Sequence, residues 1–201
     1  MPSLPGTLYV VRYTGPFGFI KPWTAVRDAE TFSQPFLTPS ILEGMRQKLG
    51  VEAIATHRLS HAGIARQQEQ TQARAWTKVR DKALAKGNER FNRSQGILVR
   101  GVMLSPHLHL AFGTAADAAR AAEQHVCLCR NEDVLLPEPP TEMTTDAFAA
   151  IPGFTFEERS GPGTLLVGYN RFDLDGEGKP RAMTGLVHTV GLPVRQDTLT
   201  A

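Results

Sequence analysis

The sequence predicts an α+β protein in which helices cover one face of a β-sheet. Three observations predict it: apolar segments with the two-residue alternation of strands, segments with helical spacing and clear caps, and an order in which strands and helices alternate before a strand-rich end. Of the 201 residues, 41% are hydrophobic and 21% are charged. A single domain over residues 1–201 with a substantial core is therefore expected.

The first predicted unit is a strand, a long loop and a capped helix. Leu8 to Tyr13 is an apolar strand candidate, and residues 15–37 form the loop. We expect a helix over residues 38–49, because Thr38 can cap its start, a proline follows, and Gly50 can end it in the left-handed conformation. Most connections in compact domains have about four to six residues, so the long loop is a candidate functional segment.

A strongly basic segment, residues 57–100, follows a predicted strand over residues 51–58. It holds ten Lys/Arg and three acidic residues, so it carries +7 and leaves −5 for the rest of a chain of net charge +2. Residues 65–86 lack Gly and Pro and are rich in Gln, Ala, Arg and Lys, which predicts a helix. We interpret residues 57–100 as an inserted arm or thumb. Its charge indicates either a polyanionic partner or a solvated helix face.

The remaining elements are shorter. We predict strands at 96–104, 107–112, 125–130, 164–168 and 183–190, a helix over 115–124 capped by Thr114, a short helix at 146–151, a Pro-rich connector at 136–145 and a loose tail at 196–201. Together with the first unit, this order is that of a ferredoxin-like sandwich followed by a β-rich C-terminal part.

No feature of the sequence indicates a membrane or secreted protein. No apolar run is long enough to span a bilayer, and the first residues lack the features of a signal peptide. Cys127 and Cys129 are one residue apart, where a disulfide would be strained. We therefore expect free thiols and a cytoplasmic location.

Metal and nuclease chemistry are the alternatives to simple binding. His107 with His109, and Cys127 with Cys129, each share a strand face and could hold zinc, although their spacing is not that of common structural zinc sites. His57 and His61, with a nearby Lys or Tyr, could cleave RNA by general acid–base chemistry, but a histidine in a basic loop more often contacts a phosphate or a base. We expect no catalytic residue, no metal and no cofactor.

Aromatic and basic side chains alternate in the long loop. Phe17, Phe19 and Trp23 are interleaved with Lys21 and Arg27. Aromatic rings stack unpaired bases while cations hold phosphates, which is how single-stranded nucleic acid is usually bound. The rings could equally fold the loop onto the core, whereas the two cations favour an RNA contact.

The same region resembles a known family. Residues 15–51 read GPFGFIKPWTAVRDAETFSQPFLTPSILEGMRQKLGV, and they resemble the N-terminal region of the Cas-five family, the RAMP subunits of CRISPR effector complexes. The likeness rests on the loop FGFIKPW at 17–23 and on QPFLTPSILEGM at 34–45, and it covers about the first quarter of the chain.

This resemblance implies a ferredoxin-like (RRM-like) RAMP domain that caps the 5′ handle of the crRNA in a Cascade-like effector complex for antiviral and antiplasmid defence. It also implies contacts with a Cas-seven-type backbone subunit and the large effector subunit, with target DNA as a further candidate for the arm. Some relatives cleave precursor crRNA, so a metal-independent endoribonuclease is the first alternative. A basic protein-interaction module is the second.

The residues expected to contact RNA lie in the opening loop, the first helix and the basic arm. They are Phe19, Lys21, Trp23, Arg27, Ser40, Arg46, His57, Arg58, Arg66, Arg74, Lys78, Arg93 and Arg100.

Overall fold

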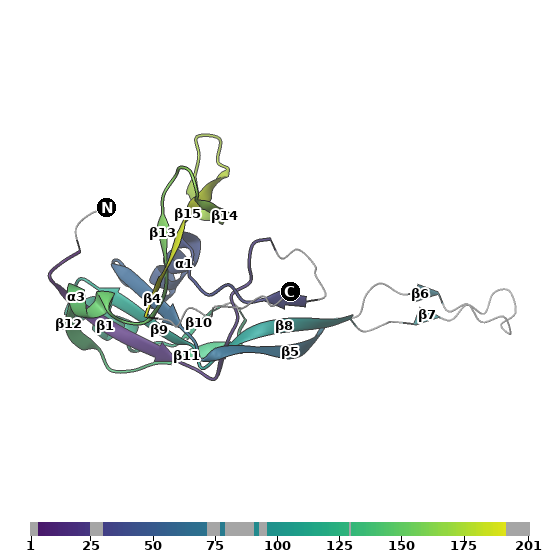
Figure 1. Ribbon diagram of the computed structural model, residues 1–201, viewed down its shortest axis with the longest axis horizontal. Coiled ribbons are helices and arrows are strands. Elements are labelled where there is room, and N and C mark those ends of the chain that lie inside the picture. Colours follow the sequence, from purple (N-terminus) through teal and green to yellow (C-terminus); the bar gives the residue numbers. More distant parts are fainter. Residues whose placement is uncertain are drawn as a thin grey trace, which may run out of the picture.

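The computed structural model describes residues 4–24, 30–71, 77–78, 91–92, 96–128 and 130–191. Within these ranges the protein is a mixed α/β structure, rich in sheet and with few helices (Figure 1). The described helices are α1 (Pro39–Leu49), α2 (Ala115–Ala121) and α3 (Thr145–Ala149). None of them is long and apolar enough to cross a membrane.

A nine-stranded sheet forms the body of the molecule. Its order is β10-β11-β1-β9-β4-β13-β15-β14, and β12 also pairs with β1. These strands are β1 (Thr7–Thr14), β4 (Thr56–Ser60), β9 (His107–Phe112), β10 (Val126–Cys127), β11 (Val134–Pro137), β12 (Thr141–Thr144), β13 (Gly153–Glu158), β14 (Leu165–Leu174) and β15 (Pro180–Val190).

The centre of this sheet is a β–α–β–β–α–β unit. In chain order it runs β1, α1, β4, β9, α2, β11, and the four strands lie side by side as β11-β1-β9-β4. Strand β9 is antiparallel to both of its neighbours. Because an α-helix connects β1 to β4, these two strands run in the same direction and leave room for β9 between them.

The main core lies between α1, α2 and one face of the central strands. Tyr13, Leu108 and Leu110 from the strands are fully buried there, together with Leu49 of α1 and Ala121 of α2. A smaller cluster on the opposite face packs α3 against Leu8 and Val10 through Phe148. Alternate residues of β1 thus serve two different cores, as the two-residue period of a strand requires.

Helix α1 confirms the local signals in the sequence. The Thr38 hydroxyl accepts a hydrogen bond from the Ile41 amide at 3.4 Å, and a proline occupies the first helical position. Gly50 ends the helix with a φ of 66°. In this left-handed conformation its N–H is directed back to the carbonyl groups of the last turn.

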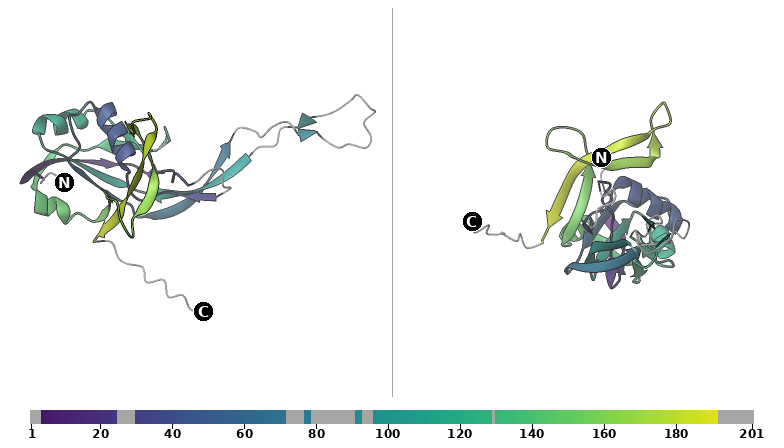
Figure 2. Two further views of the ribbon diagram at one scale, coloured as in Figure 1. Left: turned by 90° about the horizontal axis from the view of Figure 1, so that it is seen from above. Right: turned by 90° about the vertical axis from the view of Figure 1, so that its right-hand side faces the viewer.

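The basic arm is a β-hairpin at its root. Strand β5 (Gly63–Thr71) pairs antiparallel with β8 (Gly96–Leu104) along its whole length, and the hairpin projects from the body (Figure 2). Strands β2 (Phe17–Gly18) and β3 (Glu30–Phe32) also pair with β8. Farther out, β6 (Thr77–Lys78) pairs with β7 (Phe91–Asn92).

The helix predicted over residues 65–86 is therefore wrong where it overlaps β5. Gln, Ala and Arg have favourable helix propensities, and they are frequent in this segment. However, β8 is an apolar strand that supplies a pairing partner for every residue from Gly63 to Thr71. Burial follows the strand period, with Ile64, Arg66 and Gln68 exposed and the residues between them partly buried. Tertiary pairing outweighed local preference.

The predicted Pro-rich connector at 136–145 contains parts of two strands. Tyr13 and Thr14 at the end of β1 pair with β11, whereas the first half of β1 pairs with β12. Two prolines at 139 and 140 lie between these strands, where no ladder hydrogen bond is needed. The tail at 196–201 lies outside the described residues.

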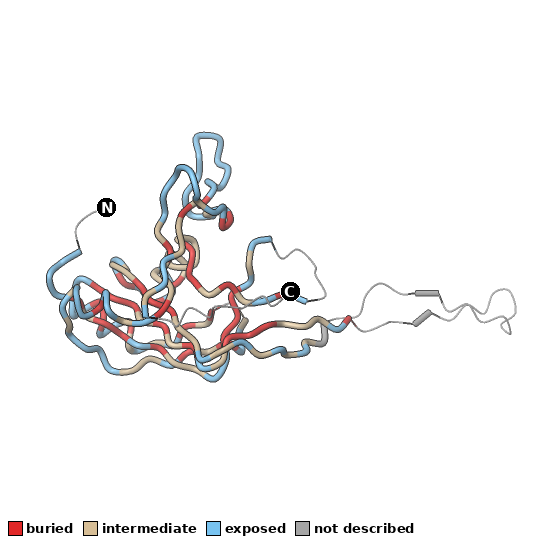
Figure 3. Tube along the Cα trace, in the orientation of Figure 1, coloured by how far each residue is buried: buried red, intermediate tan, exposed pale blue. Residues whose placement is uncertain are grey.

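The C-terminal strands extend the sheet and then leave the body. Strand β15 pairs with β13 on one side and β14 on the other, and the β14–β15 hairpin stands away from the central strands (Figure 1). Figure 3 shows the contrast in burial between the body and the outer part of this hairpin, which is largely exposed.

Candidate nucleic-acid interface

Phe19 belongs to the interior of the molecule. Its side chain is 2% exposed, and two guanidinium groups lie near its ring, with Arg100 at 5.4 Å and Arg130 at 5.6 Å from the ring centroid. The ring is therefore buried and already in contact with two cations of the protein itself. This corrects the expectation that Phe19 stacks on a base.

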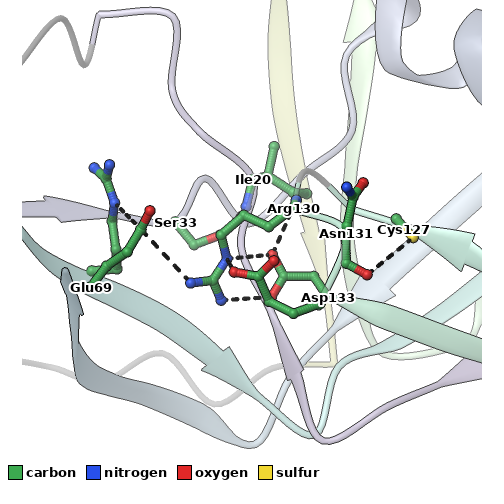
Figure 4. A network of polar contacts seen from close by, with 9 residues as sticks. Ile20, Ser33, Glu69, Cys127, Arg130, Asn131 and Asp133 are labelled. Carbon is green, nitrogen blue, oxygen red and sulfur yellow. Dashed lines mark hydrogen bonds and ion pairs between the residues drawn. The ribbon is translucent and has the colours of Figure 1, made fainter. Parts of the chain in front are cut away.

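The two guanidinium groups belong to a network at the root of the arm (Figure 4). Arg130 binds the fully buried carboxylate of Asp133 through two hydrogen bonds of 2.6 and 2.8 Å. Glu69 of the arm lies 3.1 Å from Nε of Arg100 and 4.0 Å from Nη1 of Arg130. The hydrogen bonds to Asp133 raise the pKa of Arg130. Arg100, predicted to bind phosphate, instead helps to fix the arm.

Two further predicted phosphate contacts are held by carboxylates. Arg46 makes a two-pronged ion pair with Glu43 at 2.7 and 2.8 Å, and its Nη1 donates to the Val51 carbonyl. The hydrogen bond from Arg46 lowers the pKa of Glu43 to about 2. Arg66 pairs with Glu30 at 2.6 Å and lies over the ring of Phe32. Such pairing weakens the field that each cation presents to RNA.

His57 and Arg58 are buried rather than exposed to a ligand. His57 is 3% exposed, its Nε2 has no hydrogen-bond partner among the described residues, and burial lowers its pKa to about 4. Arg58 is 7% exposed, lies over the ring of Phe148 and donates to the Ala149 carbonyl at 3.5 Å. Both residues were expected to contact RNA, and the structure makes them part of the core. The other candidate base, His61, is half-buried and stacked on Phe154.

Four of the predicted contacts cannot be placed. Arg27, Arg74 and Arg93 lie outside the described residues, and the side chain of Lys78 is likewise not described.

Several exposed cations remain without a partner. Across the described ranges, neither a carboxylate nor a hydrogen-bond acceptor engages the side chains of Lys21, Lys48, Arg159 and Arg171. Lys21 was predicted from the sequence. Lys48 and Arg171 were not, and they lie on α1 and β14, which pack against each other.

Trp23 joins the opening loop to β14. Its indole Nε1 donates to the Leu166 carbonyl at 2.9 Å, and its ring meets Tyr169 edge to face, with 5.9 Å between the ring centroids. Gly168 has a φ of 134°, and a Cβ there would lie 3.3 Å from Cβ of Trp23. Trp23 stays 46% exposed and Tyr169 55% exposed. Two half-exposed aromatic rings thus meet at β14, the strand that also carries Arg171.

A pocket of about 420 Å³ opens at Arg171, two positions after Tyr169 in β14. Helix α1 forms one wall, the segment around β10 forms another, and Arg171 contributes from β14. Its lining residues are Ser40, Ile41, Gly44, Met45, Lys48, Val126, Cys127, Leu128 and Arg171. Ser40 is the only predicted RNA contact in this lining. The lining contains two cations and no acidic residue.

The candidate metal ligands that the structure describes lie on separate strands, with His107 and His109 on β9 and Cys127 on β10. Among the residues that the structure describes, no three His, Cys, Asp or Glu side chains gather as a metal site would require. Cys127 lies in the pocket wall. Cys129 is outside the described ranges.

The site was only partly visible in the sequence. Lys48 had a local signal, because it follows Ile41 and Met45 at helical spacing on the same helix. Tyr169 and Arg171 had none, since they reach the loop and α1 only through the long-range packing of β14. The described part of the interface therefore contains Lys21, Trp23 and Ser40 from the prediction, and Lys48, Tyr169 and Arg171 from the structure alone.

Comparison with known proteins adds a structural likeness. No protein-family model matches the chain, and no curated protein matches its sequence. The structure is similar to a chain of a solved "CRISPR RNA-guided surveillance complex", with 15% sequence identity, a TM-score of 0.51, and coverage of 91% of this chain and 89% of that chain. At this identity the likeness concerns the fold. This protein and that component of a CRISPR RNA-guided surveillance complex therefore share one fold.

Proposed function

We propose that this protein is an RNA-binding subunit of a CRISPR effector ribonucleoprotein and that it caps the 5′ handle of the crRNA. The observation that carries this proposal is that the opening loop and α1 both approach β14, which brings the half-exposed rings of Trp23 and Tyr169 together and places Lys48 and Arg171 around one pocket. The shared fold supports it. The strand order β11-β1-β9-β4, with α1 and α2 on one face, supports the ferredoxin-like (RRM-like) interpretation.

The proposed mechanism combines charge attraction with stacking. Lys21, Lys48 and Arg171 attract the phosphates of an unpaired strand, because no nearby carboxylate within the described structure neutralises them. The faces of Trp23 and Tyr169 that remain open then stack on bases. Neither the cations nor the aromatic rings distinguish one base from another. Sequence preference must therefore come from the pocket or from neighbouring subunits.

The arm is the proposed contact with the rest of the complex. It projects from the body and carries exposed apolar side chains, Ile64 at 42% and Ile97 at 60% exposed (Figure 2). Exposed apolar residues on a projecting element are typical of subunit contacts. A Cas-seven-type backbone subunit is the proposed partner, and the large effector subunit a second one.

A binding titration with labelled repeat-handle RNA tests the proposal. We expect Trp23→Ala and Tyr169→Ala each to weaken binding by roughly 5- to 100-fold, since stacking contributes about 1–3 kcal/mol per base. Lys179→Gln is the matched control, because Lys179 is exposed but paired with Glu177 at 2.7 Å. Absence of handle binding by the wild type, or an equal loss in the control, would sink the proposal.

The endoribonuclease alternative has less structural support. His57 is buried with its pKa lowered, and His61 stacks on Phe154, so neither is placed as an open acid–base pair. Incubation of repeat RNA with the purified chain in the absence of added metal distinguishes the two functions. Site-specific cleavage that disappears in His57→Ala or His61→Ala would favour the enzyme over the binding subunit.

A further inference from the structure

We propose that the pocket between α1 and β10 seats one unstacked nucleotide, with its phosphate between Lys48 and Arg171. This inference rests on the proposed function and deepens it, because it names what part of an RNA strand this site takes. The pocket is lined by Ser40, Gly44, Lys48, Cys127, Arg171 and their apolar neighbours.

The size and floor of the pocket suit a nucleobase. A volume of about 420 Å³ falls in the range of small-ligand sites. Met45, Val126 and Leu128 line it and are buried. An apolar floor accepts the flat face of a base, while the Ser40 hydroxyl and the Cys127 thiol offer polar atoms to its edge.

The charge of the pocket suits a phosphate. Lys48 approaches from α1 and Arg171 from β14, and no acidic residue lines the space between them. The Arg171 guanidinium rests on the ring of Phe172, 4.6 Å from its centroid, which holds it beside the helix. Two cations from separate elements thus face one cavity whose remaining wall is mainly apolar. A nucleotide matches both features, because its phosphate suits the cations and its flat base suits the apolar wall.

Gly44 keeps this space open. It lies inside α1, where glycine is unfavourable relative to alanine because of its backbone entropy. A Cβ at this position would lie 3.5 Å from Nη2 of Arg171 and 4.0 Å from Cε2 of Phe172. A longer side chain would extend into the region that the proposed nucleotide occupies.

Alkylation of Cys127 reports directly on occupancy of the pocket. Cys127 is a partly exposed free thiol in the wall, and Cys129→Ser leaves it as the sole cysteine of the chain. We expect saturating handle RNA, and millimolar nucleoside monophosphate, to slow its reaction with N-ethylmaleimide at least fivefold. Replacing both cations, by Lys48→Gln and Arg171→Gln, should abolish that protection.

A second variant tests the shape of the pocket. Gly44→Leu should weaken handle binding about tenfold or more, whereas Gln47→Leu should leave it within twofold. Gln47 is an exposed residue of the same helix that does not line the pocket, so it controls for added apolar bulk. Thermal unfolding of both variants checks that α1 remains folded, and the alkylation test does not depend on either.

These experiments test the nucleotide pocket and the proposed handle binding separately. Handle binding with unchanged Cys127 alkylation would refute the pocket and keep the proposed function. Protection by nucleoside monophosphates without handle binding would keep the pocket and refute the proposed function. Failure of both would refute both.

Discussion

At the scale of single residues, six of the nine predicted RNA contacts whose side chains are described are buried or paired within the protein. Arg46, Arg66 and Arg100 were predicted as cations for RNA, but each has a carboxylate partner, Glu43, Glu30 or Glu69. Glu30 and Glu69 are distant in sequence from the arginines they bind. A count along the chain therefore shows how much positive charge is present, and only the fold shows which charges remain available.

Buried His57 should make stability depend on pH. Burial holds its pKa at about 4 in the folded protein, below the unfolded value of 6.5. The unfolded chain therefore takes up a proton first as the pH falls, so stability is lost between about pH 6.5 and pH 4. From pH 7 to pH 5 this residue should cost about 2 kcal/mol.

Urea unfolding of His57→Leu at pH 7 and pH 5 checks this. The substitution removes the titrating group from the core, so the loss of stability between pH 7 and pH 5 should be smaller than that of the wild type by about 2 kcal/mol. Part of the loss remains because burial also lowers the pKa of His109 to about 4 and lowers the pKa of His61. Parallel pH profiles for the two proteins would show that His57 does not titrate as described.

At the scale of elements, signals within one short segment predicted helix α1 correctly, whereas the strand pairing of β5 was not predicted. Helix α1 has its cap, proline and terminal glycine within one short segment, and all of them act there. Strand β5 has no such local instruction. Its partner β8 lies more than twenty residues away, so residues with good helix propensity formed a strand.

The network at the root of the arm should contribute strongly to stability. Asp133 is fully buried and neutralises Arg130, whose side chain is 16% exposed. Asp133→Asn removes the buried carboxylate from this pair and leaves Arg130 only the longer contacts with Glu132 at 3.5 Å and Glu69 at 4.0 Å. Removing one partner of a buried pair typically costs about 3–5 kcal/mol. The chemical-denaturation midpoint of the variant, compared with wild type, measures the loss.

Glu177→Gln provides the control for this prediction. It removes the carboxylate of an exposed pair with Lys179, for which a change within about 0.5 kcal/mol is expected. Equal effects of the two substitutions would mean that Asp133 contributes no more than a surface charge.

At the scale of the whole molecule, the candidate interface is assembled from distant segments. Trp23 donates to Leu166, 143 positions later in the chain. The opening loop has the aromatic and basic composition of a binding segment, so the sequence identified it as a candidate, and its contact with RNA stays a prediction. The second half of the interface was not identified, because nothing near Tyr169 or Arg171 in sequence indicates that β14 returns to α1.

Handle binding should depend on salt in proportion to the phosphates contacted. If Lys21, Lys48 and Arg171 each contact one phosphate, the slope of log K against log salt should be about −2 for a single strand. Each Lys→Gln or Arg→Gln variant should reduce the magnitude of the slope by about 0.7. Titrations from low to moderate salt measure it.

Arg66→Gln is an informative comparison in the same series. Arg66 is already paired with Glu30, so its loss should leave the slope nearly unchanged. A slope that responds to Arg66 but not to Lys48 or Arg171 would place the RNA along the arm instead.

The arm can become longer or shorter without any change in its strand register. Ser60 and His107 are direct partners in the main sheet, and the arm between them keeps an unshifted register from Gly63 opposite Leu104 to Thr71 opposite Gly96. Deleting equal numbers of residues from both strands near the outer end shortens its reach by about 3.4 Å per pair, without altering the pairing that remains. In the proposed assembly, the spacing between this protein and its neighbours could therefore change through insertions and deletions alone, while the fold stays constant.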